Sequence, residues 1–201
     1  MRPGAAIILC VWLSAAGAAQ GVLGGADGAA GRGDDLYHRG LYREAIDVWH
    51  QAAEKGDHEA EYRLAKTYID GVSIERDFAA AARYLKPAAQ SGMALAQFEY
   101  ATLFDNGWGV EKSKSAAAKW YLEAAQRGVP AAMFNIAAMI ETGEGIRSDV
   151  IESFKWYFLS YENGLADIAD LPLEMLAERM TAAEIHRALD RVAAFRIREG
   201  N

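Results

Sequence analysis

The sequence predicts an all-α fold, a right-handed α/α solenoid of helical hairpins that ends in a C-terminal helical cap. Glycine recurs every 36 residues, at Gly56, Gly92, Gly128 and Gly164. Alanine and aromatic residues recur with the same spacing, and a period of this length is typical of solenoids. Between the glycines, the apolar residues follow the spacing of one helix face rather than that of a strand.

The first 19 residues have the features of a secretory signal peptide. Arg2 precedes an apolar run from Ala5 to Leu13, and small residues follow, which predicts cleavage near Ala18 or Ala19. The run is shorter than the roughly 20 residues of a membrane span, so we expect no integral span after cleavage. An uncleaved anchor is the alternative. Cys10 is the single cysteine, so the mature chain would have no disulfide.

Two short segments separate the signal peptide from the first full repeat. Residues 20–33 consist largely of glycine and alanine, which predicts a flexible linker. Residues 34–57 contain Trp49 and Ala52 before Gly56, in the arrangement of the second half of a repeat. We therefore expect an N-terminal partial repeat over residues 34–57.

Each full repeat reads as two helices joined by a short turn. In the first one, Ala60, Leu64 and Tyr68 form an apolar stripe, and Gly71 stands where a left-handed residue ends a helix. Asp77 has the position of an N-cap for the second helix. The predicted first helices are 58–70, 94–106 and 130–142, and the predicted second helices are 77–90, 113–126 and 149–162.

The repeat resembles a known family. The residues that carry the resemblance are the run from Ala60 to Ala65, then Tyr68, Gly71, the Gly-x-Gly-Val turn at 107–110, and the Trp-Tyr and Ala-Ala pairs before the next glycine. They are similar to the Sel-one-like repeat, a relative of the tetratricopeptide repeat. The resemblance covers three units, at residues 58–93, 94–129 and 130–165. It implies a solenoid that binds proteins.

The remaining residues, 166–201, are expected to form the helical cap. Pro172 is expected to break the chain, because proline lacks the backbone donor that a helix interior needs. Thr181 and Glu184 then have the spacing of a capping box, which predicts a helix that starts at this point. Such a cap would cover the last repeat.

Composition and motifs argue against several functions. The 28 acidic and 21 basic residues give a net charge of -7, which disfavours binding to nucleic acid. The Gly-x-Gly turns lie between helices and follow no strand, so they are not phosphate loops. His50 and His58 flank Gly56, but a zinc site needs three or four converging ligands. We expect no cofactor, no metal and no enzymatic activity.

A protein-binding groove is predicted on the concave surface, which the first helices line in related solenoids. Its aromatic residues would form the floor, and its carboxylates, taken to be exposed, would attract a basic protein or peptide segment. The alternative is that the aromatic residues only pack the hairpins and that Trp108 folds onto its own unit. The candidate groove residues are Tyr62, Lys66, Asp70, Phe98, Thr102, Asp105, Asn106, Trp108, Phe134 and Glu141.

The preferred functional hypothesis is an exported, periplasmic adaptor or regulator that binds a protein segment. Its relatives are generally scaffolds of this kind, which is what the resemblance implies. A second hypothesis is a hydrolase of cell-wall or β-lactam substrates, as for cysteine-rich relatives. Those relatives depend on paired cysteines in each repeat, which the mature chain lacks. A passive structural module is the third.

Overall fold

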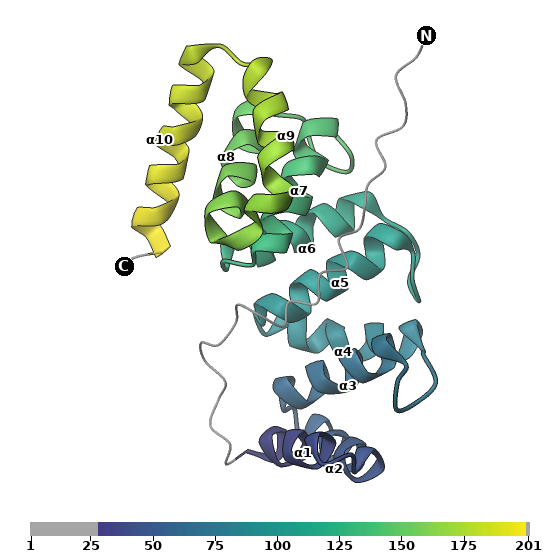
Figure 1. Cartoon of the computed structure of the whole chain (residues 1–201). Helices are drawn as coiled ribbons and strands as arrows, with labels where there is room; N and C mark the ends of the chain where they lie inside the picture. The colour runs from purple at the N-terminus through teal and green to yellow at the C-terminus, as the bar shows by residue number, and fades with distance from the viewer. Residues whose placement is uncertain (1–27, 200–201) are drawn as a thin grey trace.

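The computed structural model describes residues 28–199, which form helices and turns without a strand in that range. Successive hairpins stack on one another from the N-terminal to the C-terminal end (Figure 1). None of the described helices is long and apolar enough to span a membrane. The helices are α1 (Ala29–His38), α2 (Tyr42–Ala53), α3 (His58–Asp70), α4 (Phe78–Gln90), α5 (Ala94–Asn106), α6 (Lys114–Gln126), α7 (Pro130–Thr142), α8 (Val150–Ser160), α9 (Ala166–Glu178) and α10 (Ala182–Glu199).

The N-terminal part differs from the prediction. The expected linker at residues 20–33 is helical from Ala29 onward, and α1 and α2 form a complete hairpin rather than half a repeat. Gly33 is buried because the ring of Trp49 occupies the place where a Cβ atom would lie. The Trp49 indole also donates a hydrogen bond to the Ala30 carbonyl, at 3.1 Å. Residues 1–27, with the predicted signal peptide, lie outside the described residues.

The helix ends of the three full units follow the sequence signals. The first helices α3, α5 and α7 end at Gly71, Gly107 and Gly143, each with a positive φ that glycine adopts without strain. Asp77 caps α4 by accepting a hydrogen bond from the Ala80 backbone N–H, at 2.9 Å. The observed first helices coincide with the predicted ranges.

The turn between the two helices touches the preceding unit. A Cβ atom on Gly109 would lie 2.2 Å from the carbonyl carbon of Phe78, at the start of α4. A Cβ atom on Gly145 would lie 2.3 Å from the carbonyl carbon of Lys114, at the start of α6. The second glycine of these turns therefore permits close backbone contact between successive units.

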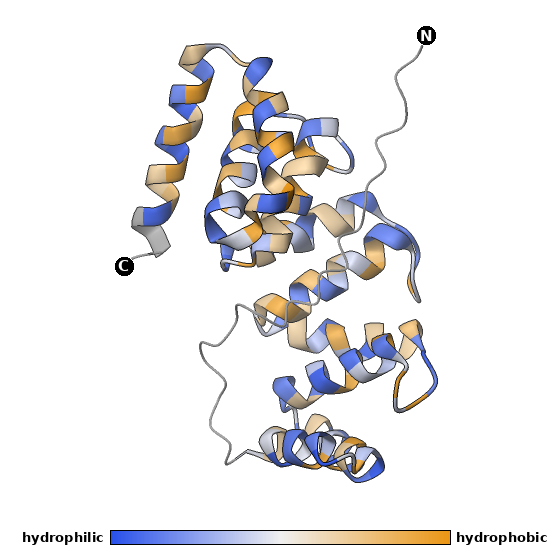
Figure 2. Cartoon of the chain, in the orientation of Figure 1, coloured by the Kyte–Doolittle hydropathy of each residue, from blue (hydrophilic) through white to orange (hydrophobic). Residues whose placement is uncertain are grey.

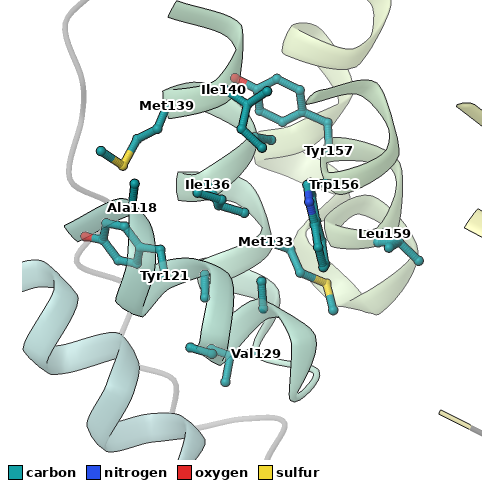
Figure 3. Close-up of a cluster of buried hydrophobic side chains, with 14 of the residues drawn as sticks. Ala118, Tyr121, Val129, Met133, Ile136, Met139, Ile140, Trp156, Tyr157 and Leu159 are labelled. Atoms are coloured by element: carbon teal, nitrogen blue, oxygen red, sulfur yellow. The ribbon is translucent and has the colours of Figure 1, made fainter. Parts of the chain in front are cut away.

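The hydrophobic core runs along the stack, between helices of the same unit and of neighbouring units (Figure 2). Its largest cluster joins α6, α7 and α8 (Figure 3). Trp156 is the largest fully buried side chain, and Ile136 and Tyr121 lie in the same cluster. Ser153 is fully buried where other units have alanine, and its hydroxyl donates to the Ala137 carbonyl, at 2.8 Å. Alanine columns between the helices permit this close packing.

The C-terminal helices form a cap with an unexpected geometry. Helix α9 continues through Pro172, so the expected break there is wrong. The chain turns earlier, at a kink within Tyr161–Leu165, where Asn163 and Gly164 have non-helical backbone angles and Gly164 has a positive φ. The Thr181 and Glu184 capping box forms as predicted, with the Thr181 backbone N–H donating to the Glu184 carboxylate, at 2.9 Å. Helix α10 then packs against α8, away from α9 (Figure 1).

Candidate protein-binding groove

The first helices α3, α5 and α7 present one partly exposed surface, which is charged on α3 and mixes polar with apolar residues on α5 and α7. We call it the first-helix face; within it, no side chain is buried. It consists of Glu59, Arg63, Lys66 and Asp70 on α3, Leu95, Phe98, Glu99, Thr102 and Asn106 on α5, and Ala131, Phe134, Asn135, Ala138 and Thr142 on α7.

Two cations on this face connect successive units. Arg63 donates to both carboxylate oxygens of Asp34 on α1, from Nε at 2.8 Å and from its terminal nitrogen at 3.0 Å. Lys66 binds Glu99 on α5 at 3.1 Å, and Asp70 on its own helix at 3.5 Å. Paired charges thus hold the first helices of three units side by side.

Burial and these carboxylates act in opposite directions on Lys66. Burial disfavours the charged ammonium group, but Glu99 and Asp70 outweigh this effect and raise the pKa of Lys66. For Arg63, burial is likewise outweighed by the hydrogen bond to Asp34, so its pKa is raised. Both side chains therefore stay charged at neutral pH and fix the positions of their partner carboxylates.

A surface cavity of about 280 Å³ opens beside these cations. Asp34, Tyr37 and His38 of α1 line one side, with Trp49 of α2. The other side comes from α3 and consists of Arg63, Lys66, Thr67 and Asp70. Lys66 and Asp70 are among the predicted groove residues, and the structure places both at this cavity.

Tyr62, Phe98 and Phe134 occupy the same position in the three full repeats, but they differ in burial. Tyr62 is buried, and burial, reinforced by Glu99, raises the pKa of its hydroxyl. Phe98 lies 5.8 Å from the Tyr121 ring, and Phe134 lies 5.4 Å from the Tyr157 ring; both tyrosines belong to the second helix of the same hairpin. Hairpin packing, the alternative, accounts for most of the contact made by these rings.

Two further candidates on α5 hold their own helix and hairpin. The Thr102 hydroxyl lies 3.1 Å from the Tyr121 hydroxyl, and it donates to the Phe98 carbonyl at 3.0 Å. Asn106 donates from its amide to the Thr102 carbonyl, at 2.9 Å. Both residues lie on the first-helix face, where these contacts are structural, and their role in a groove stays a prediction.

Asp105 is not an exposed groove carboxylate, so that expectation is wrong. Its side chain is buried, and one oxygen lies 2.7 Å from the ammonium of Lys114 on α6. Lys114 also binds Glu144 of the next turn, at 2.9 Å. Asp105 occupies the position of Ile69 in the preceding unit, which is buried as well. The column therefore faces the protein interior.

Glu141 lies in the same column and also has structural partners. It accepts a hydrogen bond from the Tyr157 hydroxyl, at 3.3 Å, and pairs with Arg179 at the end of α9, at 2.8 Å. It is only partly exposed, and it ties α7 to α8 and to the cap.

Trp108 is partly buried, so the expectation of an exposed anchor is wrong. It packs against a cluster that includes Tyr100 and Leu103 of its own unit, as the alternative expects, and also against the preceding unit. Its ring stacks on Phe78 of the preceding unit, with 5.0 Å between ring centroids and an angle of 21° between planes. Trp108 therefore fills the contact between two units.

Sequence reasoning missed Arg63, Glu99 and Asp34, which organise the N-terminal half of the face. Arg63 and Glu99 occupy the same repeat position with opposite charges, and this change of sign is the signal that was available in the sequence. Asp34 could not be found in this way, because α1 begins inside the expected linker.

His50 and His58, the two histidines that flank Gly56, have partners within the fold. His58 Nδ1 lies 2.8 Å from Glu61 on the same helix, and His50 Nδ1 lies 3.0 Å from the Tyr84 hydroxyl. Among the described residues, no group of three or more histidine, cysteine, aspartate or glutamate side chains is placed to hold a metal ion.

Comparison with known proteins agrees with this architecture. The family model described as Sel1 repeat matches residues 58–93, 94–129 and 130–165. A Sel1 repeat protein from Oxalobacter formigenes has 25% sequence identity and a TM-score of 0.68, with 73% of this chain and 60% of that chain covered. The protein c5321 from uropathogenic Escherichia coli, a protective antigen with an SLR fold, has 18% identity and a TM-score of 0.58, with 84% of this chain and 45% of that chain covered.

This chain thus spans about half to three fifths of the length of those two structures. No curated protein matches it. The family model covers more than half of the chain, in three consecutive units that coincide with the three hairpins from α3 to α8. The resemblance seen in the residues is confirmed, and the chain belongs to the Sel1 repeat family, whose members are helical-repeat modules of protein interaction.

Proposed function

We propose that the protein is an exported, periplasmic adaptor or regulator that binds a segment of a partner protein along the concave groove, on the first-helix face. The observation that carries the proposal is the cavity between α1 and α3, with Lys66 and Asp70 at its wall. Around it, Asp34, Glu59, Asp70 and Glu99 are held in place by only two cations. A preorganised polar surface binds a ligand without the cost of ordering its own side chains.

The charge of this surface favours a basic segment. Four carboxylates surround two cations, so the region keeps an excess of negative charge. Asp70 is the most accessible carboxylate that borders the cavity, with 39% of its side chain exposed. A lysine or arginine side chain of the partner could reach Asp70, while Phe98 and Phe134 lie partly exposed further along the face.

Charge reversal at Asp70 tests the groove. A labelled, extended peptide of alternating lysine and alanine serves as the probe, with fluorescence anisotropy as the readout. Asp70→Lys should weaken binding by about three- to tenfold, because one attractive charge becomes repulsive. The matched control is Asp47→Lys, an exposed position on the second helix α2. Equal affinities of the two variants would contradict the groove assignment.

Export has its own test. The sequence features of residues 1–19 support cleavage near Ala18 or Ala19. Mass spectrometry of the protein from a periplasmic fraction should find a new N-terminus there. An intact Met1 in the membrane fraction would instead support the uncleaved anchor.

A passive structural module and a hydrolase make different predictions. A passive module would bind no partner at all, and Asp70→Lys would change nothing. A hydrolase would release products from wall fragments or open a β-lactam ring. The family is typically a non-catalytic interaction scaffold, which supports the adaptor.

A further inference from the structure

Helix α9 continues the row of first helices but packs differently. Its bounds, Ala166–Glu178, lie 36 residues after those of α7, so each of its residues has an equivalent in α3, α5 and α7. Met175 is equivalent to Leu103 and Met139, which are 1% and 5% exposed. Met175 itself is 57% exposed. The full units bury this position, as Thr67 on α3, Leu103 on α5 and Met139 on α7, whereas α9 leaves it open with an apolar side chain.

Leu171 extends this open surface by one helical turn. Its equivalents on α3 and α5 are Arg63 and Glu99, which reach back to the first helix of the preceding unit. Leu171 is instead 65% exposed. Leu171 and Met175 are four residues apart, so they lie together on one face of α9. Helix α10 does not cover them, because it packs against α8.

Acidic residues flank the two apolar side chains. Asp167, Asp170, Glu174 and Glu178 are all exposed, and α9 has no basic residue. No residue in the described part of the chain forms an ion pair with any of these four carboxylates, whereas the carboxylates near Lys66 are paired. The exposed stripe therefore combines an apolar pair with uncompensated negative charge.

We propose that this stripe, which we call the α9 stripe (Asp167, Leu171, Glu174, Met175 and Glu178), docks a basic amphipathic helix of a partner protein. A helix is the complementary shape, because the stripe runs straight along α9 and amphipathic helices bind such apolar rows through residues spaced three and four apart. Apolar residues of the partner cover Leu171 and Met175. Lysine or arginine residues on either side meet the carboxylates.

The α9 stripe deepens the proposed function, since it names a second partner element for the same adaptor. It is separate from the cavity beside Lys66, so each site can fail without the other. The stripe also fits the position of α9 in the array. Within the described residues, α9 is the final helix in the row formed by α3, α5 and α7, and no further hairpin follows to cover it.

The test uses the full chain and a fluorescein-labelled 18-residue helical peptide of leucine and lysine, measured by anisotropy. Leu171→Ser with Met175→Ser should weaken binding at least tenfold, and Glu174→Gln with Glu178→Gln should weaken it about threefold or more. The matched controls are Val72→Ser, which removes another exposed apolar side chain, and Glu75→Gln with Glu111→Gln, which removes two exposed turn carboxylates. Both controls should bind as the parent does.

Three results would overturn the proposal. The first is equal binding by the parent and by both α9 variants. The second is equal binding of a leucine and glutamate peptide of the same length, which would remove the need for a basic partner. The third is a dimer in sedimentation velocity that Leu171→Ser with Met175→Ser converts to a monomer, which would identify a second copy as the occupant. Asp70→Lys should weaken binding of the helical peptide less than Leu171→Ser with Met175→Ser does, and thermal melts should show that all variants are folded.

Discussion

Replacement of Gly109 by alanine tests whether close backbone contact between units stabilises the solenoid. The new Cβ atom would lie 2.2 Å from the carbonyl carbon of Phe78 and 2.4 Å from the backbone nitrogen of Ala79. Both neighbours are backbone atoms at the start of α4, which no rotamer change can move aside. The turn and α4 must therefore separate by about 1 Å to restore ordinary contact.

Two effects add up at Gly109. Its φ of 66° costs a residue with a Cβ atom roughly 1–2 kcal/mol. Overpacking against rigid backbone adds about 1–3 kcal/mol. We expect Gly109→Ala to lower the free energy of unfolding by about 2–5 kcal/mol in total. Gly128 is a matched control, because its φ is 84° but a Cβ atom added there would meet no neighbouring atom within 4 Å. Gly128→Ala should lose only about 1–2 kcal/mol.

Urea unfolding of the full chain, followed by far-UV circular dichroism, measures both variants. The difference between them isolates the contact between the turn and α4. Because solenoid stability depends on the interfaces between neighbouring units, Gly109→Ala should also broaden the transition. Equal losses for Gly109→Ala and Gly128→Ala would refute the reasoning, since the conformational effect of positive φ would then explain both.

Three further substitutions have expected outcomes. Asp105→Asn should lower the free energy of unfolding by about 1–2 kcal/mol in the urea assay. Burial lowers the pKa of Lys114, but its bonds to Asp105 and Glu144 outweigh burial and raise the pKa. The resulting stability is present below the unfolded pKa of Lys114 and lost as pH rises through the folded one, so Asp105→Asn should reduce this alkaline loss in melts at increasing pH. Gly33→Ala should lower the melting temperature, because its Cβ atom would lie 2.1 Å from the Trp49 indole nitrogen. An unchanged melting temperature and unchanged Trp49 fluorescence would contradict the packing of α1 against Trp49. Burial raises the pKa of Asp149, but hydrogen bonds from the α8 backbone and from Arg191 outweigh burial and lower the pKa. The stability that Asp149 contributes is therefore present above its unfolded pKa and lost as pH falls through the folded pKa. Asp149→Asn should flatten the acid side of a curve of unfolding free energy against pH.

The helical hairpins could be predicted because their ends depend on local chemistry. A glycine such as Gly71 ends a first helix through its own backbone freedom, and Asp77 starts the next helix through its own side chain. Neither signal needs knowledge of the rest of the fold. The repeat places the same signals every 36 residues, so an error in one unit would have been evident from the others.

The N-terminal hairpin could not be predicted for the opposite reason. Glycine and alanine are typical both of flexible linkers and of helices that pack closely. Gly33 is present because the Trp49 ring lies against it, a contact between residues 16 positions apart that composition does not reveal. Helix α1 is also joined to α2 by three residues, where the full units have seven, so the 36-residue spacing does not extend to it.

The groove could be predicted only in part. Residues at equivalent positions of the repeats face either outward or inward, and their residue types alone do not always show which. Lys66 and Asp70 belong to columns that face outward, and they line a cavity between α1 and α3, while the binding role predicted for them stays a prediction. Asp105 belongs to the column of Ile69, and that isoleucine indicated an inward direction in the sequence itself. Charge alone suggested an exposed site, but the residue type in the neighbouring unit gave the better evidence.

The contact between a turn and the preceding unit shows that a residue which departs from the repeat pattern should be explained by its packing before a functional role is assigned to it. Phe78 and Trp108 are 30 positions apart, and their rings stack. Lys114 and Glu144 occupy the same two positions one unit later, and they form an ion pair of 2.9 Å. One interface is aromatic and the next is ionic, although the backbone contact beside each is alike. The identity of the turn residue is thus set by its neighbour in the preceding unit, and an unusual tryptophan in such a turn indicates its packing partner before it indicates a ligand.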